Sequence, residues 1–223
     1  MNVLIPVLIA IVVFVVSATI TRLLPDTLRT AHPWLSQAVV KGLLVALSVG
    51  LMRLSRRPFA DFGFRRPTAK SKRWIALGFL LGAIATVTML SLGLQGLQSV
   101  LKGYTFPMII FWVWIVSSVS EEIFVRGWFQ SALAHRGVDM RTAIIASGLL
   151  FGSMHLSLLV AGIPPPSVAI LVTFTATLGL LCAYLRATRD SLLPAIYAHI
   201  AFNLGGAFAG VLFVVIRKLA HRH

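Results

Sequence analysis

The feature that most limits the fold of this chain is a series of long apolar runs without a charged residue. Residues 3–20 and 74–101 are two such runs. A helix that crosses the hydrocarbon core of a bilayer needs about 20 predominantly apolar residues, so runs of this length indicate transmembrane helices. The whole chain is 58% hydrophobic and only 12% charged, which is far more apolar than a soluble domain. Because little polar sequence lies between the runs, we expect residues 1–223 to form a single membrane-embedded domain.

The runs predict an all-α fold, a polytopic bundle of about eight transmembrane helices. We expect the first helix to be retained, because no basic segment precedes it as in a cleaved signal peptide. The last apolar stretch, residues 191–216, is long for one helix and short for two. A break at Gly205-Gly206 would give two helices, and the bundle has seven if the stretch is one helix. The other expected spans are 3–20, 37–54, 74–101, 107–134, 142–161 and 167–185.

Basic residues gather between the spans and set the expected orientation. Residues 53–73 contain eight basic side chains and one acid, Asp61, so the positive-inside rule places this loop and the N-terminus in the cytoplasm. We expect the plasma (inner) membrane as the location. The net charge of +14 lies in such loops rather than on one soluble face, which argues against nucleic-acid binding and for contact with membrane lipids. Lys41 is expected near the outer end of its span, where its side chain can snorkel.

Two adjacent carboxylates stand inside the fourth apolar span. Glu121 and Glu122 are the only glutamates in the chain, and Arg126 follows four residues after Glu122. An ionised side chain at the centre of a bilayer costs about 2.5 kcal/mol or more, so three so close together need a reason. Residues four apart share a helix face, so Arg126 can neutralise Glu122. Glu121 is rotated by about 100° from this pair and stays unpaired, which suits a general base.

Two histidines lie at a depth similar to that of Glu121. At about 1.5 Å per residue, Glu121 and His155 are each about 20 Å from the inner ends of their helices, and His199 is about 14 Å from its own. Asn203 follows His199 by one helical turn. Each of these residues alone is as well explained by a structural hydrogen bond between helices. Together, on three helices at compatible depth, they indicate either a hydrolytic centre or an ion path.

At these residues the sequence resembles the CPBP family of intramembrane proteases, which includes the type II CAAX prenyl proteases and bacteriocin-processing or immunity proteins. Three motifs occur in the family's order on separate apolar segments within residues 107–203, the expected catalytic core. The segment Asp61–Arg66 also resembles the one that often precedes the family's third span. The motifs are Glu-Glu-x-x-x-Arg at Glu121, Glu122 and Arg126, Phe-x-x-x-His at Phe151 and His155, and His-x-x-x-Asn at His199 and Asn203.

The resemblance implies an intramembrane endopeptidase with a helical bundle around a water-accessible cavity. It implies that Glu121 and His155 activate a water, that His199 and Asn203 stabilise the oxyanion, and that Glu122 and Arg126 orient the reacting groups. It leaves two possibilities for a cofactor. Glu121, His155 and His199 are a plausible Zn²⁺ set with one open position, as in a metalloprotease. A metal-free, glutamate-dependent mechanism is the other possibility.

Two other functions stay open from the sequence. A proton-coupled transporter could use the same glutamate and histidines as a relay, although no internal repeat is evident. A non-catalytic membrane scaffold or immunity protein could keep the motifs for binding. Under the protease reading, the expected partner is a membrane-bound or lipidated peptide or protein. The sequence does not indicate an oligomeric state.

Overall fold

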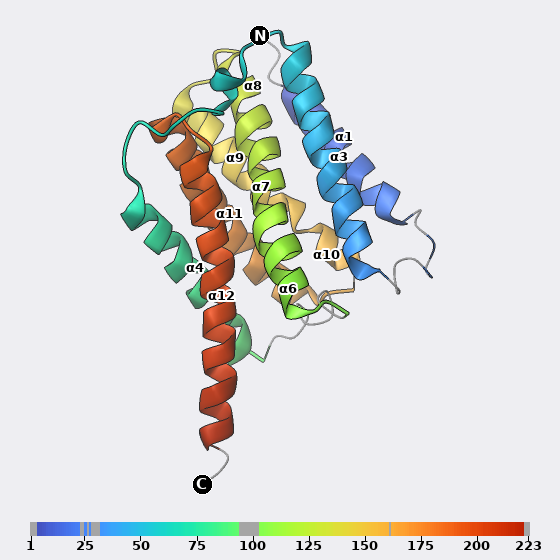
Figure 1. The fold of residues 1–223 in the computed structure, drawn as a ribbon, viewed down its shortest axis with the longest axis vertical. Helices are drawn as coiled ribbons and strands as arrows, with labels where there is room; N and C mark the ends of the chain where they lie inside the picture. The colour runs from blue at the N-terminus through green and yellow to red at the C-terminus, as the bar shows by residue number, and fades with distance from the viewer. Residues whose placement is uncertain are drawn as a thin grey trace.

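The computed structural model describes residues 4–22, 25, 27, 32–93, 103–160 and 162–220. These residues form helices and connecting turns without a strand, which confirms the predicted all-α bundle (Figure 1). Within the described ranges, six helices are long and apolar enough to cross a membrane, and a shorter apolar helix covers residues 4–16. The chain is therefore an integral, multi-pass membrane protein. The elements are α1 (Leu4–Arg22), α3 (Pro33–Leu54), η1 (Phe59–Phe62), α4 (Lys72–Ser91), α6 (Phe106–Met108), η2 (Ile109–Val116), α7 (Ser117–Glu122), η3 (Ile123–Gln130), α8 (Ser131–Ala134), α9 (Met140–Met154), α10 (Ser157–Val160), α11 (Pro165–Arg189) and α12 (Leu193–Ala220).

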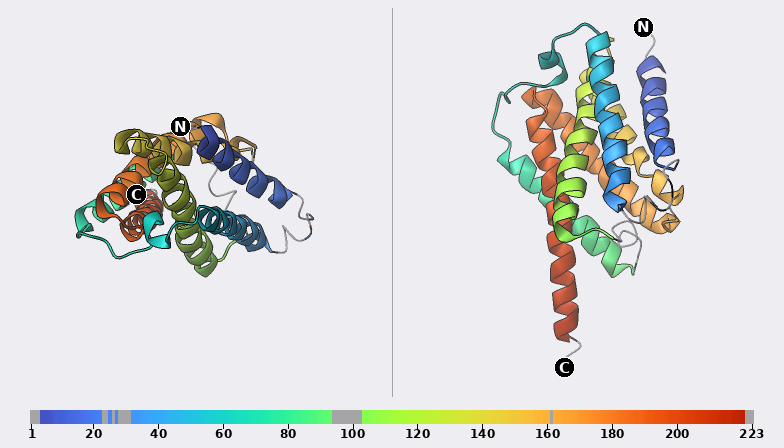
Figure 2. Two further views of the ribbon diagram at one scale, coloured as in Figure 1. Left: turned by 90° about the horizontal axis from the view of Figure 1, so that it is seen from above. Right: turned by 45° about the vertical axis from the view of Figure 1, so that its right-hand side comes forward.

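The central helix of the bundle is Phe106–Ala134, which runs without a break through α6, η2, α7, η3 and α8. It lies between α3 on one side and α9, α11 and α12 on the other (Figures 1 and 2). Two stretches of it, η2 and η3, are π-helical, and η3 begins directly after Glu122. Wide turns of this kind are frequent at functional sites, because they change which side chains share a face. The part of this helix that carries the two glutamates is thus buried between its neighbours.

The last apolar stretch forms one helix, α12, rather than two. The expected break near Asn203 to Gly206 is absent, so the described helices agree with the seven-helix alternative. Gly205 lets α12 pack closely against α4, because a Cβ at this position would overlap the backbone oxygen of Phe79 in α4. Gly82 of α4 makes the reciprocal contact, with the backbone of Phe202. Small residues let two membrane helices approach closely, and here they fix α12 against α4.

The start of α1 and the end of α12 lie at opposite ends of the bundle (Figures 1 and 2). α12 continues past the other helices, and its last turn carries Arg217 and Lys218 (Figure 2). The third predicted span also ends earlier than expected, since α4 stops at Ser91, and residues 94–101 of that span lie outside the described part of the chain.

The basic segment after α3 is attached to the turn between α11 and α12. The buried Arg186 donates a hydrogen bond from Nη2 to the backbone oxygen of Asp61 at 2.8 Å. The backbone nitrogen of Leu192 donates to the Gly63 oxygen at 2.9 Å, and Arg65 forms a 2.8 Å ion pair with Asp190. This segment is therefore a docked part of the fold as well as a carrier of positive charge.

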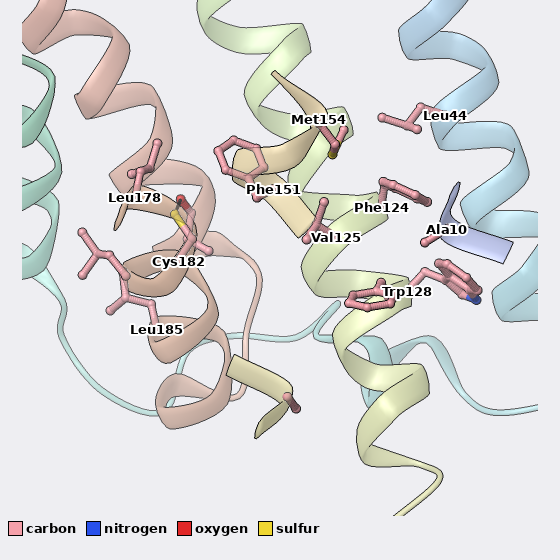
Figure 3. Close-up of a cluster of buried hydrophobic side chains, with 14 of the residues drawn as sticks. Ala10, Leu44, Phe124, Val125, Trp128, Phe151, Met154, Leu178, Cys182 and Leu185 are labelled. Atoms are coloured by element: carbon pink, nitrogen blue, oxygen red, sulfur yellow. Dashed lines mark hydrogen bonds between the residues drawn. The ribbon is translucent and has the colours of Figure 1, made fainter. Parts of the chain in front are cut away.

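Apolar side chains from most of the described helices fill the interior beside the glutamates. Figure 3 shows Leu44 of α3, Phe124 of η3, Met154 of α9 and Leu178 of α11 converging in one cluster. Ala10 brings α1 to the same cluster. Because Phe124, Val125 and Trp128 belong to this cluster, its packing fixes the rotation of η3.

Candidate active site

The centre of the bundle holds four charged side chains in two ion pairs. Glu121 pairs with Lys41 of α3 at 2.5 Å, and Glu122 pairs with Arg126 at 2.9 Å. The side chains of Glu122 and Arg126 are completely buried, and those of Lys41 and Glu121 are each 12% exposed. The charges of the two carboxylates and the two cations cancel. This pairing lowers the large free-energy cost of removing each charged group from water.

Glu122 connects three elements through a single oxygen atom. Its Oε1 accepts hydrogen bonds from Arg126 Nη1 and from His199 Nδ1, both at 2.9 Å. Arg126 also donates from Nη2 to the backbone oxygen of Gly179 in α11 at 2.8 Å. The predicted pairing of Glu122 with Arg126 is thus present. These contacts fix the ring of His199, so that its Nε2 faces the other glutamate.

Glu121 faces both Lys41 and His199. The Glu121 Oε1 atom accepts from Lys41, and Oε2 lies 3.8 Å from His199 Nε2. Two expectations were therefore wrong. Glu121 is not unpaired, and Lys41 does not snorkel to the outer surface, because its ammonium group points inward to the carboxylate.

Sequence reasoning missed Lys41, although one signal could have found it. Lys41 lies thirteen residues before Leu54, the end of α3, and Glu121 lies thirteen residues before Ala134, the end of α8. At about 1.5 Å per residue, both side chains are about 20 Å from the ends of their helices.

The aromatic ring of Phe151 lies among the histidines and Arg126. Its centroid is 5.3 Å from that of His155 and 5.2 Å from that of His199, in both cases edge to face. The guanidinium carbon of Arg126 lies 4.6 Å from the centroid of the same ring. Phe151, the aromatic residue of the second motif, therefore contacts both imidazoles and the guanidinium group of Arg126.

His155 follows the last residue of α9 rather than lying in the middle of a helix. Its Nδ1 donates to the backbone oxygen of Phe151 at 3.1 Å, and its ring interacts electrostatically with Glu121. The described contacts include no hydrogen bond between these two side chains. His155 thus borders the cluster and has Nε2 available.

Asn203 joins the cluster through Ser118. Its Nδ2 donates to the hydroxyl of Ser118 at 3.1 Å, one turn before Glu122 on the central helix. Further along the helix, Gln130 donates to the backbone oxygen of Ala183 at 3.0 Å. Ser118, Glu122, Arg126 and Gln130 are spaced four residues apart on one face of the central helix, and this face contacts α11 and α12.

The arrangement does not fit a bound metal ion. Among the described residues, no group of three histidine, cysteine, aspartate or glutamate side chains is placed to hold one. Of the expected ligands Glu121, His155 and His199, the first has an oxygen occupied by the ammonium group of Lys41. A second cation at that oxygen would be repelled by the lysine.

Residues 103–205, just under half of the chain, match the family described as Rce1-like, type II CAAX prenyl endopeptidase Rce1-like. All residues of the three motifs lie inside this segment, and Lys41 lies outside it. No curated protein and no solved structure matches the chain. The matched family implies a protease and confirms the recognition made from the motifs. Through the segment that carries these motifs, the chain is similar to the Rce1-like type II CAAX prenyl endopeptidase family.

Proposed function

We propose that this protein is an intramembrane endopeptidase that hydrolyses a peptide bond of a membrane-associated or lipidated peptide or protein. The observation that carries the proposal is the 3.8 Å separation between Glu121 Oε2 and His199 Nε2. This distance is too long for a direct hydrogen bond. It suits one water placed about 2.8 Å from both atoms, in position to be activated.

In the proposed reaction Glu121 is the general base. It takes a proton from the water while the water oxygen bonds to the peptide carbonyl carbon. The carbon–nitrogen bond then breaks, and the proton passes from Glu121 to the leaving amine. The products are a carboxylic acid and an amine, which become a carboxylate and an ammonium group after proton transfer, so the reaction balances with water as the only co-reactant.

The contacts support a division of labour that differs in part from the one implied by the resemblance. His199, rather than His155, has its ring nitrogen beside Glu121, so we assign His199 to holding the water. Asn203 lies one turn further along α12 and can contribute an amide donor to the oxyanion. His155 keeps a proposed role at the edge of the cluster, through its electrostatic interaction with Glu121.

We propose that the reaction is metal-free, because the donor atoms do not fit a metal ion. Dialysis of the purified protein against a zinc chelator, followed by metal analysis, tests this point. Activity that persists at metal contents far below one ion per protein supports a glutamate-dependent mechanism. Activity that is lost on dialysis and restored by Zn²⁺ overturns it.

The direct test of the proposed function uses protein in liposomes and a farnesylated peptide with a C-terminal CAAX sequence. We expect the wild type to cleave the peptide and Glu121→Gln to lose at least about 10²-fold in kcat, the usual contribution of a general base. Ser120→Ala is a matched control, because within the described residues the hydroxyl of Ser120 donates to the backbone oxygen of Ser117 and to no other group.

Full activity of Glu121→Gln would contradict the proposal. Binding of the peptide without cleavage by the wild type would favour a non-catalytic scaffold. Comparison of membrane proteomes from cells with the wild type and with Glu121→Gln would then identify the natural substrate.

The proposal includes a location and an orientation. We place the protein in the plasma (inner) membrane, with the N-terminus and the 53–73 loop in the cytoplasm, from the eight basic residues of that loop. A Cys182→Ser background with Arg66→Cys tests the orientation, because a membrane-impermeant thiol reagent should label Arg66→Cys only after the membrane is opened. Labelling in intact cells would reverse the orientation.

A further inference from the structure

We propose that Lys41 is a positioning residue for the reaction, the fixed cation that holds Glu121 as a base inside the membrane. This inference rests on the proposed function. Lys41 comes from α3, outside the segment that matches the family, and belongs to none of the three motifs. The chain therefore supplies its own cation at the carboxylate from a helix that the family match does not cover.

The burial of the two partners is the first support. The side chains of Lys41 and Glu121 are each only 12% exposed and meet at 2.5 Å. A lysine whose side chain could reach the membrane surface would be expected to extend there. Lys41 instead extends into the bundle, which is favourable only if the carboxylate compensates its charge.

The other cation of the cluster cannot replace Lys41. Arg126 uses Nη1 on Glu122 and Nη2 on the backbone oxygen of Gly179. Its guanidinium group also lies over the ring of Phe151. These three contacts hold Arg126 on the Glu122 side of the central helix. Without Lys41, the cluster would keep two carboxylates and one cation, and Glu121 would be the carboxylate left without an ion pair.

The contact also orients the carboxylate. Lys41 binds Oε1, so Oε2 is the oxygen that faces His199 Nε2. A carboxylate is planar, so fixing one oxygen restricts the position of the other. Lys41 thus acts on the proposed water through Glu121 without touching it.

The test compares Lys41→Met, which removes the charge at similar size, with Lys41→Arg, which keeps it. The assay is cleavage of the farnesylated CAAX peptide by protein in liposomes, with kcat and KM measured separately. We expect the kcat of Lys41→Met to be at least about 10²-fold lower than that of the wild type, the same loss as when a general base is removed. Its KM should change by less than about threefold. Lys41→Arg should keep at least about a tenth of the wild-type kcat.

A double variant separates positioning from folding. In the Glu121→Gln background, Lys41→Met should cause no further loss of activity, because the base is already absent. The double variant should also unfold at a higher temperature than Lys41→Met alone, since no unpaired buried carboxylate remains. Ser48→Ala, on the same helix with its hydroxyl bonded to the Leu44 backbone oxygen, is the control for changes in α3.

The outcomes distinguish this inference from the proposed function. A kcat of Lys41→Met equal to that of the wild type would overturn the role of Lys41 but not the proposed function. The same holds if Lys41→Arg and Lys41→Met are both folded and equally inactive. Full activity of Glu121→Gln would overturn the proposed function itself. If Lys41→Met does not fold, the double variant decides: we expect it to fold, and an equally unfolded double variant contradicts the inference.

Discussion

Asn203 on α12 donates a hydrogen bond to the hydroxyl of Ser118 on the central helix, at 3.1 Å from nitrogen to oxygen. Ser118 is completely buried and lies one turn before Glu122. The contact therefore ties the third motif to the helix that carries the first. It leaves two explanations for the asparagine: a clamp between helices, or a donor to the oxyanion that turns from Ser118 to the substrate.

The first prediction distinguishes these explanations. We expect Asn203→Ala to lower kcat about 10²-fold, the usual cost of removing an oxyanion donor. Ser118→Ala removes the same interhelical hydrogen bond but leaves the amide in place, so its kcat should fall by less than about tenfold, because such bonds contribute about 0.6 kcal/mol in membranes. Equal losses of kcat in the two variants would identify a clamp.

The second prediction concerns the stability of the Glu122–Arg126 pair. Arg126→Met leaves Glu122 without its guanidinium partner in a site with no exposure. Breaking a buried pair in this way should cost about 3–5 kcal/mol of unfolding free energy. Arg126→Lys should also destabilise the protein, because one ammonium group cannot make both hydrogen bonds.

Thermal unfolding in detergent measures these effects, with Arg66→Lys at an exposed position as the control. The combined variant Glu122→Gln with Arg126→Met should recover part of the lost stability, because no unpaired charge stays buried. A melting temperature for Arg126→Met equal to that of the wild type would show that the pair does not stabilise the fold.

Much of the fold followed from hydropathy. The apolar runs predicted the helices, because a segment that crosses lipid must satisfy its backbone hydrogen bonds internally. The last helix was harder to predict. A Gly205-Gly206 pair weakens an isolated helix, but contact with α4 compensates, and the sequence alone does not show which helix lies beside it.

The candidate site was predictable where its contacts are local. Glu122 and Arg126 pair within one helix, so their spacing was enough. The depth argument also brought Glu121 and His199 to one place. The partner of Glu121 was missed for two reasons. Lys41 is eighty residues away in the sequence, and its position was judged from the outer end of its helix rather than from the inner end. Besides the matching depth of the two side chains, charge balance was a second clue, since two buried carboxylates need two cations.

The third prediction concerns the close packing of α4 against α12. A Cβ at Gly82 would overlap the backbone oxygen of Phe202, and backbone cannot turn aside as a flexible side chain can. Gly82→Ala should therefore destabilise the protein by about 1–3 kcal/mol, the usual cost of overpacking. It should also lower activity, because α12 carries His199 and Asn203.

Gly42→Ala is the matched control, since a Cβ there would have no neighbour within 4 Å among the described residues beyond its own helix backbone. It should be neutral or stabilising, by up to about 1 kcal/mol from the better helix propensity of alanine. Melting temperatures and kcat of the two variants, measured in the same detergent, provide the comparison. Equal stability of Gly82→Ala and Gly42→Ala would show that the two helices can separate at little cost.

The last prediction is that the stability of the fold depends on pH through a histidine at the end of the bundle that carries the basic segment. His135 follows the central helix and packs edge to face on Phe62, with ring centroids 5.4 Å apart. Burial, and then the nearby positive charge of Arg57, hold the pKa of His135 below its usual value of 6.5. The folded protein therefore binds a proton at this histidine less readily than the unfolded chain. The stability contributed by the neutral ring is present above about pH 6.5 and is lost as the pH falls through the folded-state pKa.

We expect the melting temperature of the wild type to fall between about pH 7.5 and about pH 5.5. In His135→Phe, which keeps an aromatic ring against Phe62 but cannot take up a proton, the fall should be smaller. His32→Gln, at an exposed histidine, serves as the control for loss of any one imidazole. The measurement is thermal unfolding in detergent across this pH range. An equally steep fall in His135→Phe and the wild type would assign the acid sensitivity to other groups.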